Sequence, residues 1–215
     1  MYEYLDSLLA KLKKKLKAEF NRLGMIGFDE LNVVNTKKIT KKMFDRLLAE
    51  NDKTYKKAAD NAYSSAKKMA VDAGYAEKKT SGLSDEWLVG TLLAYNLVTG
   101  YVYGKEADRK RMRLNEQILT AREYYDRQLY NSCLQRVANL WWTQTLHYAV
   151  TVVDEATLQA YKDLGVKKVR WNANLDRRTC KVCRNRHNKI YEISEVPVKT
   201  HYNCRCYLEP IHTEE

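Results

Sequence analysis

Cysteines gather near the end of the chain in two short clusters. Four of the five cysteines fall within 27 positions, as Cys180-x-x-Cys183 and within His201-x-x-Cys204-x-Cys206. Two intervening residues let the backbone turn back, so that the first pair can reach one tetrahedral ion while the second cluster supplies the remaining ligands. Clustered thiolates with an imidazole suit zinc, and structural zinc sites are closed by four protein ligands. The sequence therefore predicts a structural Zn²⁺ site.

Five side chains compete for the four positions around this ion. Cys180 and Cys183 are the firmest candidates, and two of His201, Cys204 and Cys206 complete the set. The spacing leaves open which two they are, and the residue left over can form a hydrogen bond to a ligand. His187, in the intervening loop, and His212, near the C-terminus, are weaker candidates.

Two other uses of these cysteines fit the sequence less well. A redox-active Cys-x-x-Cys normally opens a helix in a thioredoxin-like unit, which the surrounding sequence does not show. Disulfides need an oxidising compartment, whereas the N-terminal residues lack the basic and apolar segments of a signal peptide. We therefore expect the chain to fold in a reducing cytoplasm.

Basic residues surround the cysteines. The net charge of the chain is +11, with residues 1–80 and 166–210 each contributing +7 and residues 81–165 contributing −1. This distribution indicates two surfaces that face a polyanion, although a solvated lysine-rich helix face would explain the N-terminal part equally well. The candidates for contacts with DNA phosphates, which could instead balance thiolate charge, are Arg177, Arg178, Lys181, Arg184, Arg186 and Arg205.

The elements that must hold these residues follow from the apolar pattern. The first proline is Pro197, and apolar residues recur at helical spacing over residues 4–23, 39–73, 85–98 and 114–147. After residue 150 the pattern predicts a short helix over 154–164, strands over 166–173 and 189–193, and a final extended segment from 207. The expected fold is mainly α: an elongated helical domain (1–150) followed by a small α+β zinc-binding module with a basic tail (151–215).

The C-terminal segment resembles a known family. The residues that carry the resemblance are the strand from Val169 to Ala173, the run Asp176-x-x-Thr179-Cys180-x-x-Cys183, and His201-x-Asn203-Cys204-Arg205-Cys206. Together they resemble the signature of the phage Mu F-like head morphogenesis family, also called minor head or minor capsid proteins. The sequence departs from that pattern at Tyr202, where proline is usual, and at His187-Asn188, where an Asp-Gly turn is common. Neither departure removes a candidate ligand.

The resemblance implies a structural, non-enzymatic protein of a tailed phage. Such a protein would be associated with the portal protein and the major capsid protein, in the head interior near the portal, after assembly in the host cytoplasm. It would aid head assembly, DNA packaging or DNA ejection, with non-specific contacts to packaged double-stranded DNA. Self-association into a homo-oligomer is left open. A membrane is not expected, because the longest apolar runs fall far below the roughly 18 residues of a membrane span.

The alternative is a zinc-containing DNA-binding or nuclease-like protein. A nuclease needs an open metal site with a water molecule or an acidic cluster, whereas the clustered ligands here are closed and rich in thiolates. Asp176 and Glu192 are the nearby acids, and turn-forming or surface roles explain both. The chain also lacks the Gly-x-Ser-x-Gly, phosphate-loop and His-Glu-x-x-His motifs. We therefore expect that it is not an enzyme.

Overall fold

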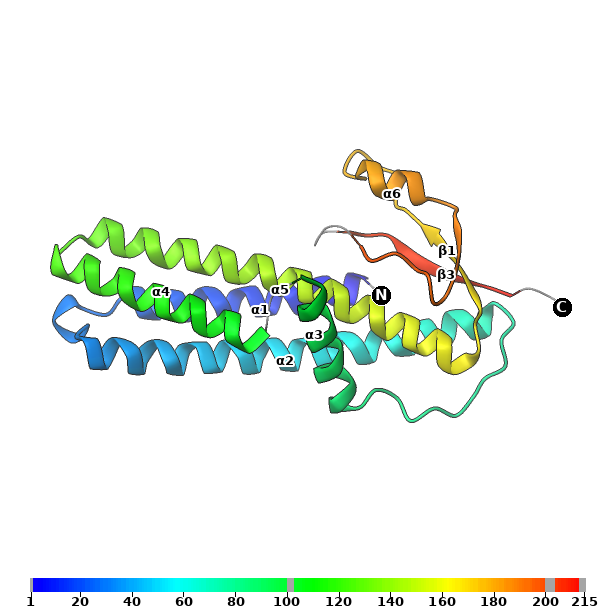
Figure 1. Ribbon diagram of the computed structural model, residues 1–215, viewed down its shortest axis with the longest axis horizontal. Coiled ribbons are helices and arrows are strands. Elements are labelled where there is room, and N and C mark those ends of the chain that lie inside the picture. The colour runs from blue at the N-terminus through cyan, green and yellow to red at the C-terminus, as the bar shows by residue number, and fades with distance from the viewer. Residues whose placement is uncertain (1, 100–102, 200–203, 213–215) are drawn as a thin grey trace. The chain divides into compact units, whose positions relative to one another are not determined.

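The computed structural model describes residues 2–99, 103–199 and 204–212. Long helices dominate this part of the chain, and one small sheet follows them (Figure 1). The mainly helical class with a C-terminal α+β region, predicted from the sequence, is confirmed. The elements in chain order are α1 (Tyr2–Gly24), a 3₁₀ turn (Phe28–Glu30), α2 (Val33–Asp72), α3 (Asp85–Thr99), α4 (Tyr103–Glu123), α5 (Arg127–Leu164), β1 (Lys168–Asn172), α6 (Lys181–Arg186), β2 (Ile190–Glu192) and β3 (Tyr207–Ile211).

The chain divides into two compact units that are discontinuous in sequence. We call residues 6–54 and 92–146 the helical unit, and residues 1–5, 55–91 and 147–215 the C-terminal unit. The long helices α2 and α5 contribute one segment to each unit. The linear domain boundary that the sequence places at residue 150 stays a prediction.

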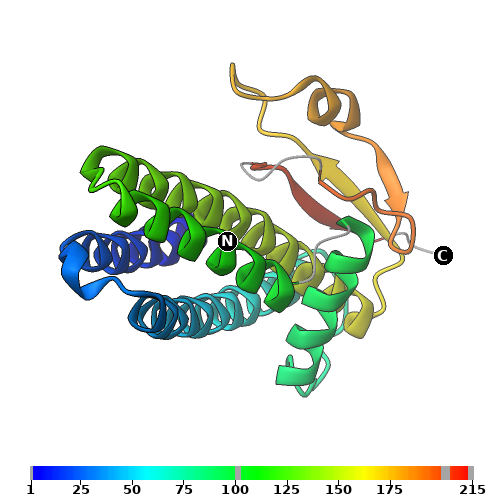
Figure 2. The same ribbon diagram turned by 60° about the vertical axis from the view of Figure 1, so that its left-hand side comes forward.

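The helical unit is held by one apolar core. Segments of α1, α2, α4 and α5 run side by side in it (Figure 2). Each helix contributes residues at three- and four-residue steps, as an amphipathic helix does when one stripe is buried. The ring of Phe44 on α2 meets that of Trp141 on α5 edge to face at 5.1 Å between centroids. The buried residues are Leu16, Phe20, Leu23, Leu31, Met43, Phe44, Leu47, Ala107, Leu114, Ile118, Ala121, Tyr130, Leu134, Val137 and Trp141.

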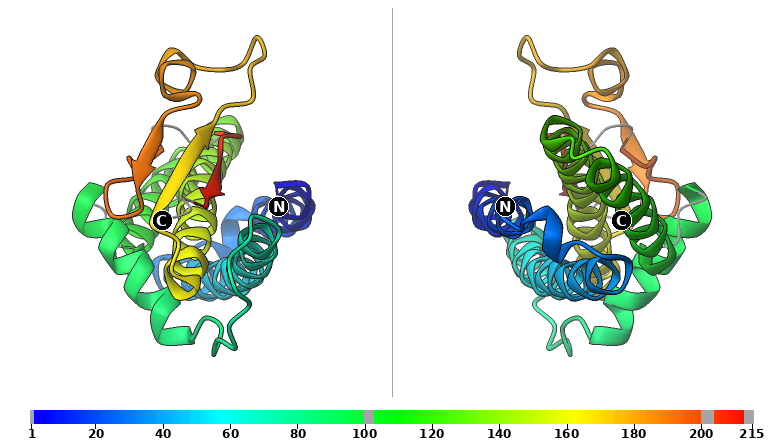
Figure 3. Two further views of the ribbon diagram at one scale, coloured as in Figure 1. Left: turned by 90° about the vertical axis from the view of Figure 1, so that its right-hand side faces the viewer. Right: turned by 90° about the vertical axis from the view of Figure 1, so that its left-hand side faces the viewer.

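The C-terminal unit contains a three-stranded antiparallel sheet with the order β2-β1-β3 (Figure 3). Val169 and Trp171 on the central strand are buried, while the three residues that alternate with them are half-buried. Their alternation gives the sheet one apolar face. The hydroxyl of Tyr161 on α5 donates a hydrogen bond of 2.9 Å to the carbonyl of Leu208 on β3. This buried bond ties the sheet to the last turns of α5.

Several helix boundaries differ from those that the sequence predicts, among them both ends of α5. The helix predicted over 114–147 is interrupted, because Tyr125 adopts a left-handed backbone (φ 50°) and the Asp126 carboxylate caps the start of α5 through the Leu129 amide, 2.8 Å away. The separate helix predicted over 154–164 is the continuation of α5. Asp154 does not start a helix; its carboxylate accepts a bond of 2.6 Å from Lys199.

Candidate metal centre

The Cys180-x-x-Cys183 motif forms the first turn of a short helix. Cys180 is the N-cap of α6, and its Sγ accepts a hydrogen bond of 3.3 Å from the backbone N–H of Cys183. A thiol or thiolate in the N-cap position satisfies one of the amides that a helix leaves unpaired at its start. The capping geometry therefore brings both sulfur atoms of the motif to the same end of α6.

The second cysteine cluster meets this helix just before β3. Cys204 and Cys206 are buried, as is Cys183, and the three Sγ atoms all lie within 4.8 Å of one another. Sulfur ligands about 2.3 Å from a tetrahedral zinc ion would lie about 3.8 Å apart. The 3.5 Å distance between the Sγ atoms of Cys183 and Cys204 is close to that value. These three cysteines could hold a metal ion.

Among the described residues, Cys180 is a candidate for a fourth ligand, although its Sγ is not one of the three that all lie within 4.8 Å of one another. It is half-buried and lines the same small cavity as the three buried cysteines. His201, which the sequence offers as an alternative ligand, lies outside the described residues. His187 is engaged elsewhere, because its Nδ1 accepts a hydrogen bond of 3.1 Å from the Ala173 amide, and His212 packs against the ring of Tyr75.

The cysteines are free thiols in this structure. The Sγ atoms of Cys183 and Cys204 are separated by 3.5 Å, well beyond the roughly 2.05 Å of a disulfide bond. Three of the described sulfur atoms therefore converge as separate thiols that could hold a metal ion.

Burial and hydrogen bonds within the cluster shift the pKa values of the four thiols. Burial raises the pKa of the Cys183 thiol to about 12, and the hydrogen bond to Cys206, together with burial, raises the pKa of Cys204 still further. The same bond from Cys204 lowers the pKa of Cys206, and the Cys183 amide lowers that of Cys180. Without a cation the cluster therefore retains protons on its most buried members. A divalent ion removes this penalty by replacing those protons with positive charge.

A polar turn fixes the approach to the cluster. The Asp176 carboxylate accepts hydrogen bonds from the Arg178 amide at 2.8 Å and from the Arg205 guanidinium at 2.5 Å. The ion pair with Arg205, followed by the Arg178 amide, holds the pKa of Asp176 below its usual range. The Thr179 hydroxyl closes the turn by donating to the Asn174 carbonyl. Asp176 therefore links the segment before Cys180 to the residue between Cys204 and Cys206, a role that the sequence reasoning missed although the Asp-x-x-Thr spacing signals a turn.

The six basic residues proposed for DNA contacts fall into two groups. Arg205 is bound to Asp176, Arg186 lies over the Trp171 ring at 5.0 Å and donates to the Val198 carbonyl, and Arg184 donates to the Asp176 carbonyl at 3.4 Å. These three help to hold the module together. The other three are exposed, and no hydrogen bond or ion pair of their charged groups occurs within the described residues: Arg177, Arg178 and Lys181.

The fold and this site define a mainly helical protein whose C-terminal unit contains a thiol cluster that could hold a metal ion. Residues 105–209, just under half of the chain, match the family model described as Phage Mu protein F like protein. The match confirms the family predicted from the sequence, and this stretch is a phage Mu F-like region. It extends beyond the cysteine motifs to include nearly all of α4 and the whole of α5.

The family suggests a phage head morphogenesis protein with a place in the virion. Comparisons with curated proteins and with solved structures give no significant match. None of the helices in the described ranges has an apolar stretch that could cross a membrane.

We predict that Cys183→Ser abolishes metal binding by the purified chain. The substitution removes one buried thiolate ligand, and the remaining ligands no longer close the site around the ion. The metal content should therefore fall from about one ion per chain to a small fraction of an ion per chain. Elemental analysis after extensive dialysis measures this content. Cys133→Ala is the control, because Cys133 is a buried cysteine of the helical unit and is not one of the three clustered cysteines. Equal metal content in the wild type and Cys183→Ser would contradict the assignment.

Proposed function

We propose that the chain is a non-enzymatic minor head protein of a tailed phage, associated with the portal and the capsid interior. The observation that carries this proposal is the family match, which contains the complete cysteine cluster and the helix leading to it. In this proposal the protein aids head assembly, DNA packaging or DNA ejection, and the portal protein and the major capsid protein are its partners.

The metal in this proposal is structural zinc, with Cys180 as the fourth ligand beside Cys183, Cys204 and Cys206. Thiolate ligands favour zinc among the abundant divalent ions, and a site closed by four protein ligands leaves no position for a reacting water molecule. The ion would hold α6 next to the segment before β3. A small module with a modest apolar core gains about 10 kcal/mol or more of folding free energy from such an ion.

The environment of the cluster supports a non-enzymatic role. Asp176 is occupied by Arg205 and by the turn that it closes, and Glu192 forms an ion pair of 3.5 Å with Lys168. Metal-assisted hydrolysis needs an open coordination position and a free general base. Within the described residues around the cluster, neither carboxylate is placed to act as that base.

Contact with packaged DNA is assigned to Arg177, Arg178 and Lys181. All three are exposed on or beside the turn that precedes α6, so their charged groups can approach phosphates without disturbing the cluster. Contacts of this kind position a protein on DNA without reading its sequence, and their strength falls steeply with salt concentration.

We predict that the triple variant Arg177→Ala, Arg178→Ala, Lys181→Ala binds duplex DNA more weakly and with a shallower salt dependence. Each lost phosphate contact lowers the magnitude of the slope of log K against log salt by about 0.9, so the expected reduction is about 2–3. Fluorescence anisotropy with a labelled duplex at several salt concentrations measures the slope. A control with Arg177→Lys, Arg178→Lys and Lys181→Arg keeps the charge and should keep the slope. An unchanged slope in the alanine variant would refute the assignment.

The location is tested on purified heads of the phage that encodes the chain. We expect the protein to co-purify with portal and capsid proteins in heads or in assembly intermediates, at few copies per head. An interior location predicts that external protease digests it only after the heads are opened, which quantitative mass spectrometry can follow. Absence of the protein from both mature heads and intermediates would contradict the proposal, and digestion in intact heads would contradict the interior location.

A further inference from the structure

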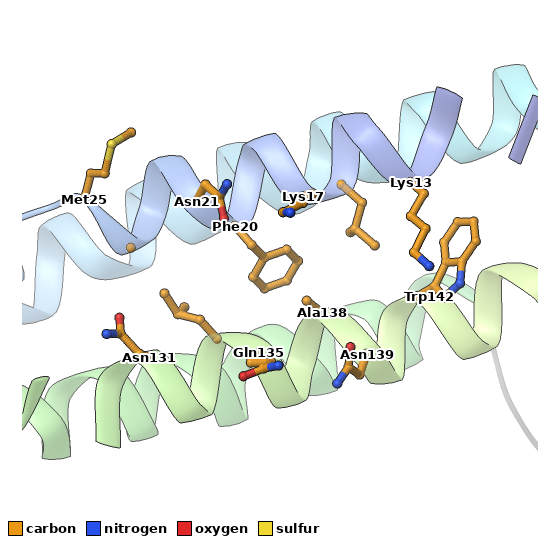
Figure 4. A pocket seen from close by; sticks show the side chains of 13 residues that line it. Lys13, Lys17, Phe20, Asn21, Met25, Asn131, Gln135, Ala138, Asn139 and Trp142 are labelled. Carbon is orange, nitrogen blue, oxygen red and sulfur yellow. The ribbon is translucent and has the colours of Figure 1, made fainter. Parts of the chain in front are cut away.

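A groove with a volume of about 740 Å³ runs between α1 and α5 in the helical unit (Figure 4). Its floor is apolar and belongs to the core. Leu16 and Phe20 on α1 and Leu134 on α5 are each 5% exposed, and the half-buried Ala138 completes the floor. The small side chain of Ala138 leaves room on the floor for a third apolar element between the two helices.

Polar side chains line both walls at helical spacing. Exposed residues from α1 form one wall and exposed amides from α5 form the other, each set at steps of four residues (Figure 4). At one end Lys13 Nζ lies 5.3 Å from the centroid of the Trp142 ring, and at the other Met25 is 76% exposed. The wall residues are Lys13, Lys17 and Asn21 on α1, and Asn131, Gln135 and Asn139 on α5.

The charge of the groove has one sign. Its thirteen lining residues include two lysines and no acid. Neither Lys13 nor Lys17 forms an ion pair with a described residue, whereas neighbouring Lys15 is bound to Glu50 at 2.5 Å. An apolar floor between basic and amide walls is complementary to an occupant with one apolar stripe and acidic flanks.

We propose that this groove binds an acidic amphipathic α-helix of a partner protein. The lining on α1 runs from Lys13 to Met25, which corresponds to about 18 Å or three helical turns. Apolar side chains at i, i+3/i+4 and i+7 of the partner would cover Phe20 and Leu134, while its carboxylates would face Lys13 and Lys17.

Other occupants fit these features less well. DNA has no apolar stripe to cover the floor, and its phosphates would be held by only two lysines. A second copy of the chain would bring another strongly basic surface, since the net charge is +11, and its α1 would place lysines against lysines. A helix satisfies its own backbone hydrogen bonds, so the amide walls need only pair with its side chains.

The test starts from an unbiased set of ligands. An mRNA-displayed library of 14-residue helical peptides with randomised side chains is selected on the full-length chain. We expect the selected peptides to combine an apolar stripe at helical spacing with an excess of Asp and Glu over Lys and Arg. Fluorescence anisotropy of a labelled selected peptide then gives its affinity for the chain and its variants.

Charge-reversal variants distinguish the contribution of the groove lysines to peptide binding from that of the protein's overall positive charge. The variant Lys13→Glu, Lys17→Glu should lower the affinity for the selected peptide by about tenfold, given the modest strength of exposed ion pairs. The matched control Lys11→Glu, Lys14→Glu makes the same change of net charge on exposed residues of α1 outside the groove and should have less than about a twofold effect. Ala138→Gln should also weaken binding, because it places a longer polar side chain on the floor.

Several results would overturn the proposal. These are selection of no acidic amphipathic peptide, equal losses in the groove and control variants, or an unchanged affinity for Ala138→Gln. Sedimentation analysis covers the remaining occupant: a dimer of the chain that dissociates with Ala138→Gln would assign the groove to a second copy instead. Circular dichroism confirms that each variant retains its helical content.

Discussion

Three buried sulfur atoms converge from segments that are far apart in sequence, and this convergence constrains the C-terminal unit. Burial raises the pKa of Cys183 to about 12, and a hydrogen bond between Cys204 and Cys206 raises the pKa of the first and lowers that of the second. Thiols in such a cluster cannot all ionise unless a cation compensates them. In the proposed metal-bound state, binding of the ion and folding of this region would be coupled, and the ion would help a helix of six residues and a three-stranded sheet to form a defined module.

The residues around the cluster divide into those that hold it and those that face outward. Asp176 and Arg205 join the two cysteine-bearing segments, and Arg186 covers the buried Trp171. The sheet in turn is tied to α5 through the Tyr161 hydroxyl. Arg177, Arg178 and Lys181, on or beside the turn before α6, keep exposed charged groups. Some of the basic residues near the cluster thus stabilise the module, and others remain exposed, where they could contact phosphates.

The sequence predicted the cluster better than its surroundings. Cysteine spacing is a local signal, and three of the five predicted ligands, Cys183, Cys204 and Cys206, lie close together in the structure. The Asp176–Arg205 pair was missed because it joins residues 29 positions apart, and nothing local to either residue indicates the contact. The break before α5 was missed because the left-handed backbone of Tyr125 has no glycine to mark it. The groove lay beyond sequence reasoning for the same reason, since it exists only where α1 meets a helix more than 100 residues later.

We propose that a metal ion held by sulfur organises the C-terminal unit. X-ray absorption spectroscopy of the purified full-length chain at the zinc K-edge tests it most directly. Coordination by Cys180, Cys183, Cys204 and Cys206 predicts about four sulfur neighbours at about 2.3 Å. A first shell dominated by nitrogen or oxygen ligands, or protein that folds fully without bound metal, would contradict it.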